Sequence, residues 1–102
     1  MIILYLTCAN DNETRTISQA LLEAKLIACA RRSLVSSSYW WDGKINDDDE
    51  VLLTMESLEE KFDEIEKIVT KIHSYDEYVL TAVPVIKTTP GVIKWLKDTL
   101  NK

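Results

Sequence analysis

Three side chains of the 102-residue chain are suited to bind a transition metal: one imidazole and two thiols. His73 is the only histidine of the sequence, and a neutral imidazole nitrogen is a common ligand of copper and other divalent ions. Cys8 and Cys29 supply softer ligands. We therefore predict His73, Cys8 and Cys29, in that order, as candidate ligands of copper or another divalent cation. One histidine does not complete a site, so further ligands must come from Asp76, Glu77, a cysteine or another subunit.

Each of the three residues also has a structural interpretation. A histidine at the end of a helix is favoured by the helix dipole, or it can be packed at an interface. Cys8 can be a small residue at a strand end, and Cys29, between two alanines, has the neighbours of a buried thiol. The segment 7–11 contains one cysteine, whereas a copper chaperone of the Met-x-Cys-x-x-Cys type holds Cu(I) between two. The sequence therefore disfavours a chaperone of that type.

A second candidate site is aromatic. Tyr39, Trp40 and Trp41 stand directly before Asp42-Gly43, a dipeptide typical of a two-residue hairpin turn. Such rings can form a platform for a flat ligand, or they can bury a large area against another subunit. Because neighbouring residues of a strand point to opposite faces, we expect Trp40 and Trp41 not to line one pocket. Further candidates for lining a cleft are Tyr75, Asp76 and Trp95.

Composition and charge narrow the class of protein. Apolar residues make up 46% and charged residues 28% of the chain, as in a soluble globule, and the length predicts a single domain over 1–102. The net charge of −5 and the lack of clustered Lys and Arg argue against nucleic-acid binding. No apolar run is long enough to cross a membrane, and two cysteines do not make a disulfide framework. We therefore expect a cytoplasmic protein with reduced thiols.

The periodicity of apolar residues predicts the elements that position these side chains. The order β-α-β-β-α-β is that of the ferredoxin-like split α/β (α+β) sandwich, here with an added C-terminal helix. Its helices cover one face of a four-stranded sheet. Because the chain is so short, we expect other copies of the chain to cover the second face of the sheet. Strands are expected at 2–6, 33–41, 51–55 and 79–86, and helices at 12–26, at 58–73 and from Thr89-Pro90 onward.

Local signals set the expected ends of these elements. Asn10, followed three residues later by Glu13, is expected to cap the first helix. Ser57 and Glu60 form a capping box before the second helix. The first strand is apolar throughout, as in a central strand that is buried on both faces. Pro84 places the last strand at an edge of the sheet or at a bulge.

Several stretches resemble the CutA family of divalent-cation tolerance proteins, over nearly the whole chain. The most specific is the aromatic hairpin 38–45, and His73-Ser74-Tyr75-Asp76 is similar to the family's His-Pro-Tyr-Glu. Further matches are Thr7, the segment 20–29 with Cys29 at its end, Glu50, Leu53, Pro84-Val85 and Trp95-Leu96. Departures are Ser74, Asp76, Tyr78, Val92 and the loop 31–37, which lacks the family's Asn and Pro-Gly.

The resemblance implies a homotrimer of ferredoxin-like protomers that is linked to tolerance of divalent metals and has no enzymatic reaction. It implies copper binding as in some members, through a cysteine near Cys8, and it places Tyr39, Trp40 and Trp41 in the trimer interface. The family also resembles PII signalling proteins in assembly. The alternative function is therefore a signalling or scaffold trimer that binds a small effector or a protein partner in its inter-subunit clefts.

Two other functions are disfavoured by missing residues. PII proteins bind nucleotides, but this chain has no Gly-rich phosphate loop. An acylphosphatase-type hydrolase shares the order of elements, but its anion cradle needs Gly and Arg where the segment 8–13 has neither. The acidic run 47–50 lacks the spacing of a calcium loop and indicates a solvated turn.

Overall fold

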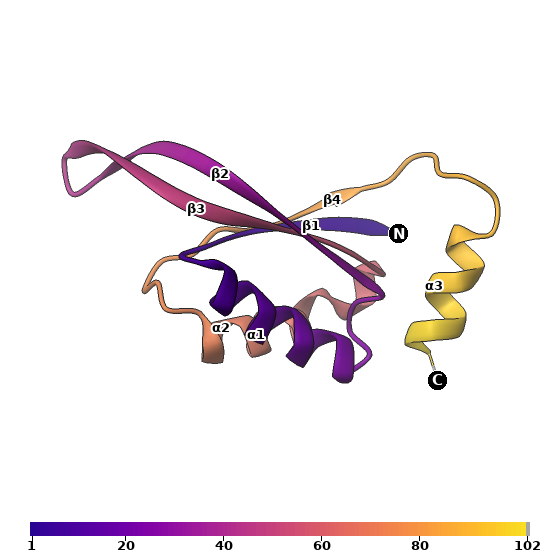
Figure 1. Cartoon of the computed structure of the whole chain (residues 1–102). Coiled ribbons are helices and arrows are strands. Elements are labelled where there is room, and N and C mark those ends of the chain that lie inside the picture. Colours follow the sequence, from indigo (N-terminus) through magenta and orange to yellow (C-terminus); the bar gives the residue numbers. More distant parts are fainter. Residues whose placement is uncertain (102) are drawn as a thin grey trace.

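Four strands and three α-helices follow one another in the order predicted from the sequence. The computed structural model describes residues 1–101 (Figure 1). No helix within that range is long and apolar enough to span a bilayer. The elements are, in chain order, β1 (Ile2–Cys8), α1 (Asp11–Glu23), β2 (Cys29–Trp41), β3 (Lys44–Ser57), the 3₁₀ turn η1 (Glu59–Lys61), α2 (Phe62–Ile72), β4 (Leu80–Pro84) and α3 (Val92–Leu100).

The strands form one antiparallel sheet in the order β2-β3-β1-β4. β1 is therefore a central strand, as predicted. β4 lies at an edge of the sheet and ends at Pro84. Proline has no amide hydrogen, and at the end of an edge strand this costs few hydrogen bonds between strands. Helices α1 and α2 lie on the same side of this sheet (Figure 1). This is the ferredoxin-like arrangement, so the predicted fold class is confirmed.

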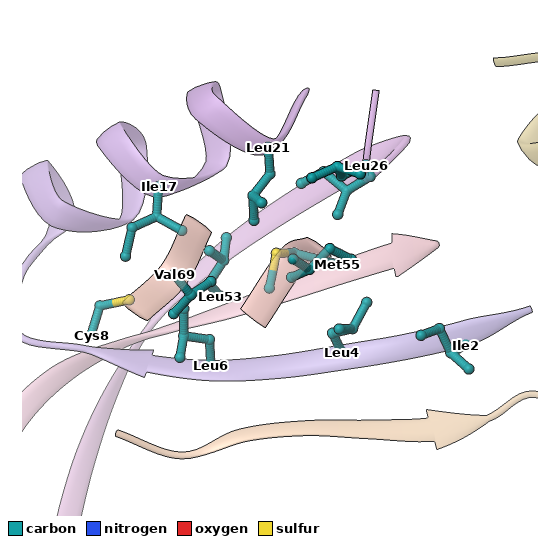
Figure 2. Packing of buried hydrophobic residues seen from close by; sticks show 12 residues of the cluster. Ile2, Leu4, Leu6, Cys8, Ile17, Leu21, Leu26, Leu53, Met55 and Val69 are labelled. Carbon is teal, nitrogen blue, oxygen red and sulfur yellow. The ribbon is translucent and has the colours of Figure 1, made fainter. Parts of the chain in front are cut away.

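The core lies between the sheet and helices α1 and α2. Leu4 and Leu6 of β1 are fully buried in one cluster with Ile17 and Leu21 of α1 (Figure 2). Tyr5, between the two leucines, is 38% exposed on the opposite face. The prediction that this strand is buried on both faces is therefore wrong for the single chain, because its own helices cover only one face.

β2 and β3 form a long hairpin that extends beyond α1 and α2 (Figure 1). An unbroken register pairs every residue of β2 with one of β3. Asp42 and Gly43 make the predicted two-residue turn, with φ of +53° and +75°, as a type I′ turn requires. Both strands are longer than the predicted 33–41 and 51–55. The acidic residues 47–49 pair with serines 36–38, so the ladder continues although these side chains are not apolar.

α1 has the predicted N-cap, begins at Asp11, one residue before the predicted start, and ends earlier than predicted. The amide of Glu13 donates to Asn10 Oδ1 at 2.8 Å, which confirms the cap. The helix ends at Glu23, three residues before the predicted end. Lys25 has a left-handed φ of 58°, and its amide and that of Leu26 bond back to carbonyls of the last turn. This Schellman closure usually contains glycine, so the lysine gives no sequence signal for it.

The capping box predicted before the second helix does not form. Ser57 is the last residue of β3, and its buried hydroxyl donates to the carbonyl of Leu26 at 2.5 Å. The prediction is wrong because the hydroxyl has a partner 31 residues away and is not free to bond its own helix. Leu58 is the N-cap residue of η1 without a side-chain bond, and α2 proper begins only at Phe62.

The C-terminal segment forms a separate small cluster. Leu96 and Leu100 of α3 are buried together with Leu58. The chain leaves β4 at Pro84, two residues before the predicted end. It then turns at Gly91, the N-cap residue of α3, which has a φ of +91°.

Candidate functional site

A cluster of three possible metal ligands lies at one end of the sheet. Cys8 ends β1, Glu13 lies in the first turn of α1, and His73 is the C-cap residue of α2. Each residue contributes one possible ligand atom: the sulfur of Cys8, a carboxylate oxygen of Glu13 and a ring nitrogen of His73. These three atoms lie within 4.8 Å of one another. Two of the three predicted ligands are thus brought together by the fold, with a carboxylate as the third group.

His73 holds three chain segments together. Its side chain is fully buried, and its Nε2 lies 2.9 Å from the carbonyl oxygen of Thr7. The amide of Tyr75 donates to Nδ1 at 3.1 Å. Because a carbonyl oxygen can only accept, Nε2 carries a proton and donates it to Thr7. In this arrangement both ring nitrogens are occupied, so a metal must replace one of these bonds.

Glu13 faces the same imidazole. Its Oε1 lies 3.1 Å from His73 Nδ1, and it also accepts from the amide of Ser74 at 2.9 Å. The hydroxyl of Ser74 donates to Oε2 at 2.7 Å. Burial raises the pKa of this carboxyl, but the two bonds from Ser74 and the nearby His73 lower it, so that the pKa lies below its ordinary value. Glu13 is therefore a charged ligand at neutral pH.

Cys8 is the buried thiol of the cluster. Figure 2 shows its side chain in the layer between β1 and α1, on the same side of the strand as Leu4 and Leu6. Burial, and after it the charges of Glu13 and Glu50, raises the pKa of the thiol to about 12. The group is therefore protonated at neutral pH, and a metal that binds it must displace its proton.

A groove of about 570 Å³ opens next to this cluster. It lies between the hairpin, the end of β1 and the segment 75–79. Its lining residues are Thr7, Ser37, Tyr39, Trp40, Trp41, Glu50, Tyr75, Asp76, Glu77, Tyr78 and Val79.

Tyr75 and Tyr78 connect the cluster to the groove. The ring centroid of Tyr75 lies 4.9 Å from that of His73, and the ring of Tyr78 stacks on His73 at 5.1 Å and 19°. The hydroxyl of Tyr75 donates to Glu50 Oε2 at 2.8 Å. Burial, together with this bond and the charge of Glu50, raises the pKa of Tyr75, so the phenol remains a donor.

The other predicted site residues are dispersed. Cys29 is half-buried at the start of β2, opposite Glu56, and does not belong to the cluster. Trp95 is 43% exposed on α3 and does not line the groove. Trp40 and Trp41 both line it, contrary to the expectation from alternation. A two-stranded ribbon twists strongly along its length. Large rings that leave opposite faces of such a ribbon can therefore both reach the same groove.

Glu13 is the functional candidate that the sequence did not indicate. Its amide and its position predicted a helix cap, which the structure confirms. Its carboxylate turns instead to Ser74, 61 residues away. In the sequence, Glu13 stands three residues after Asn10 and so indicates only a helix cap. Its contact with Ser74 depends on how α1 packs against α2, which the sequence pattern does not reveal.

The fold and this end of the sheet define a ferredoxin-like α/β protein with a candidate metal cluster beside an aromatic groove. Residues 2–99 match the CutA1 divalent ion tolerance protein family. The chain therefore belongs to this family.

Individual relatives agree with the assignment. The divalent-cation tolerance protein CutA of Archaeoglobus fulgidus is 31% identical over 98 residues, which are 96% of each chain. A CutA homolog of Xenopus laevis is 33% identical over 95 residues, and these cover 92% of this chain but only 63% of that protein. The crystal structure of CutA1 from Pyrococcus horikoshii superposes with a TM-score of 0.94 at 29% identity and covers 100% of both chains. The solved structure of the Archaeoglobus fulgidus protein has a TM-score of 0.95 at 31% identity and covers 98% of this chain and 99% of that one. That protein is described as a periplasmic divalent cation tolerance protein.

Proposed function

We propose that the chain is a homotrimeric, cytoplasmic divalent-cation tolerance protein, one domain over 1–102, that binds copper or another divalent metal and catalyses no reaction. The observation that carries the metal proposal is the convergence of Cys8, Glu13 and His73, whose ligand atoms lie within 4.8 Å of one another. A thiolate, an imidazole and a carboxylate together suit copper or zinc better than calcium or magnesium, which prefer oxygen ligands.

The hydrogen bonds around His73 indicate how a metal would enter the cluster. Nδ1 already faces the charged carboxylate of Glu13 and Nε2 is bonded to a backbone carbonyl. Binding through Nδ1 would release only the amide of Tyr75, which lies in a segment beside the open groove. The cost of losing that bond and of deprotonating Cys8 makes the affinity dependent on pH.

The trimer proposal is supported by apolar side chains that the single chain leaves in solvent. On the hairpin, Leu34 is 85%, Trp40 72% and Ile45 61% exposed. Trp40 and Ile45 are paired across the strands, so their side chains share one face. A patch of this kind usually marks an interface, and Trp and Tyr are enriched in interfaces. Light scattering during gel filtration tests the assembly, and a monomer at micromolar concentration would contradict it.

Anaerobic calorimetric titration with copper and with zinc tests the metal proposal. We expect His73→Gln and Cys8→Ser each to weaken binding by at least tenfold, and Glu13→Gln to weaken it less. Glutamine at 73 can still donate to Thr7, which limits structural damage. Cys29→Ser is the matched control for Cys8→Ser and should bind as the parent protein does. Because the Cys8 thiol has a pKa of about 12, binding at pH 7 should release a proton, seen as an enthalpy that changes with the buffer.

Circular dichroism of each variant separates lost ligands from lost folding. Variants that are folded and bind both metals with the affinity of the parent protein would remove this cluster as the metal site.

The alternative, a signalling or scaffold trimer of the PII kind that binds an effector, is favoured by the groove beside the cluster. A hollow of about 570 Å³ is within the range of small-molecule sites.

A further inference from the structure

Ser74 holds the carboxylate of the cluster with two hydrogen bonds. Its amide donates to Oε1 of Glu13 at 2.9 Å and its hydroxyl donates to Oε2 at 2.7 Å, across 61 positions of the chain. A carboxylate oxygen has two lone pairs, so Oε1 can accept from the amide and still offer an electron pair to the cluster. Ser74 therefore fixes the direction of a candidate ligand without being a ligand itself.

His73 has the same kind of support. Its Nε2 donates to the carbonyl oxygen of Thr7 at 2.9 Å, which leaves Nδ1, 3.1 Å from Oε1 of Glu13, as the nitrogen for a metal. Histidines that bind a metal usually donate their second nitrogen to a carbonyl or a carboxylate in this way, and carboxylate ligands are in turn hydrogen-bonded. Two of the three candidate ligands are thus oriented by hydrogen bonds to groups outside the cluster.

The charge of the cluster matches that of a divalent ion. Once the thiol of Cys8 has lost its proton to a metal, the thiolate and the carboxylate of Glu13 carry two negative charges, and a neutral imidazole adds none. A divalent ion would neutralise both charges, whereas Cu(I) would leave one. The side chain of Glu13 is 9% exposed, and its one ion pair within residues 1–101 is with His73. Because an uncompensated buried charge is costly, the carboxylate favours the divalent ion.

Ligand chemistry favours the same class of ion. A carboxylate oxygen binds divalent ions such as zinc, whereas Cu(I) is selected by soft sulfur ligands. Cys8 and His73 alone would therefore discriminate less between the two ions than they do with Glu13 in place. The place of Glu13 in turn depends on Ser74. The similar family motif, His-Pro-Tyr-Glu, has proline at this position, which has neither an amide hydrogen nor a hydroxyl to donate.

We propose that Ser74 is the positioning residue that gives this site its preference for a divalent ion of the zinc type over Cu(I). It holds the carboxylate of Glu13 beside Nδ1 of His73 and does not contact the ion. The proposal rests on the proposed function, metal binding at the cluster, and adds the class of ion and the residue that selects it.

Competition with chromophoric chelators measures the affinity of the full-length protein for Zn(II) and, without oxygen, for Cu(I). Ser74→Ala removes one hydrogen bond and should weaken zinc binding about fivefold. Ser74→Pro removes both donors and should weaken it at least about tenfold; His73 already has the ψ of 135° that a residue before proline adopts. Both variants should bind Cu(I) nearly as the parent protein does. Ser18→Ala, which removes a hydroxyl of α1 that bonds Arg15, is the matched control and should leave both affinities unchanged.

A double variant separates positioning from a general effect on folding. If Ser74 acts through the carboxylate, Ser74→Ala should weaken zinc binding no further in a Glu13→Gln background. Additive losses, equal losses for both ions, or unchanged zinc affinity in both Ser74 variants would overturn the proposal and leave metal binding in place. A parent protein that binds Cu(I) but not Zn(II) would do the same. A parent protein that binds neither ion would overturn the proposed metal site as well.

Discussion

The buried cluster and the open groove lie on two sides of the same short segment, 73–78, and differ in how their polar groups are satisfied. In the cluster, Ser74 donates to Glu13 while Tyr75 and Thr7 occupy the nitrogens of His73. In the groove, the rings of Trp40 and Trp41 lie largely in solvent. The comparison teaches that the cluster must give up internal bonds in order to bind a metal, whereas the rings of the groove can be covered by another copy of the chain without losing any internal bond.

The largest contrast is expected in thiol chemistry. Because the pKa of Cys8 rises from 9.0 to about 12, its alkylation by iodoacetamide at pH 8 should be roughly a thousandfold slower in the folded protein than in urea. Mass spectrometry of labelled peptides measures the rate. Cys29, half-buried at the start of β2, is the control in the same molecule and should react first. Folded protein in which Cys8 is labelled as fast as Cys29 would show that the cluster is open.

The next effect is on stability. Glu13→Ala removes the acceptor of both donors of Ser74 and should lower the free energy of unfolding by about 1–3 kcal/mol. Glu23→Ala, on the same helix, removes a carboxylate whose one side-chain donor within residues 1–101 is the exposed Gln19. This control should change stability by less than about 0.5 kcal/mol in urea unfolding. Similar losses in both variants would mean that the bonds of Glu13 contribute no more than a surface pair.

The same carboxylate should give the cluster an acid limit. The pKa of Glu13 is lower in the folded chain than its ordinary value of 4.5, so the ionised form favours folding. That contribution is complete above pH 4.5 and is lost as the pH falls through the folded value. Thermal unfolding from pH 7 to pH 3 should therefore lose less stability in Glu13→Gln than in the parent protein. Parallel curves for the two proteins would remove Glu13 as a source of acid sensitivity.

The smallest effects compare two phenols that line the groove. Tyr75→Phe removes the bond to the buried Glu50 and should cost about 1 kcal/mol. Tyr39→Phe removes a bond to Asp48 on the hairpin, which the proposed trimer would cover, so it should lower the melting temperature as well. An unchanged melting temperature in Tyr39→Phe would show that the hairpin lies in solvent and would contradict its place in the interface.

The sequence predicted the elements whose signals are local. Asp42-Gly43 specifies a turn with two positive φ values, and Asn10 with Glu13 specifies a helix start, so both are found where expected. Alternating burial also defines the core side of β1. The end of α1 was misplaced because Lys25 closes it in a backbone conformation that sequence assigns to glycine.

The site was only partly predictable, for a related reason. The metal-binding potential of His73 and Cys8 follows from residue type, but the approach of Glu13 depends on contacts across 61 positions. Ser57 shows the same limit, since its hydroxyl matched a local capping pattern but bonds Leu26 instead. Long-range hydrogen bonds of polar residues leave no periodic trace in the sequence.

The bond from Ser57 to Leu26 and that from His73 to Thr7 fasten the helical layer to the sheet at two separate places. Each fastening joins one side chain to one main-chain carbonyl, and neither uses sulfur. Both cysteines remain free thiols. The stability of the folded state therefore does not depend on the redox potential of the surroundings. Glutathione or an added reductant should leave the melting temperature unchanged.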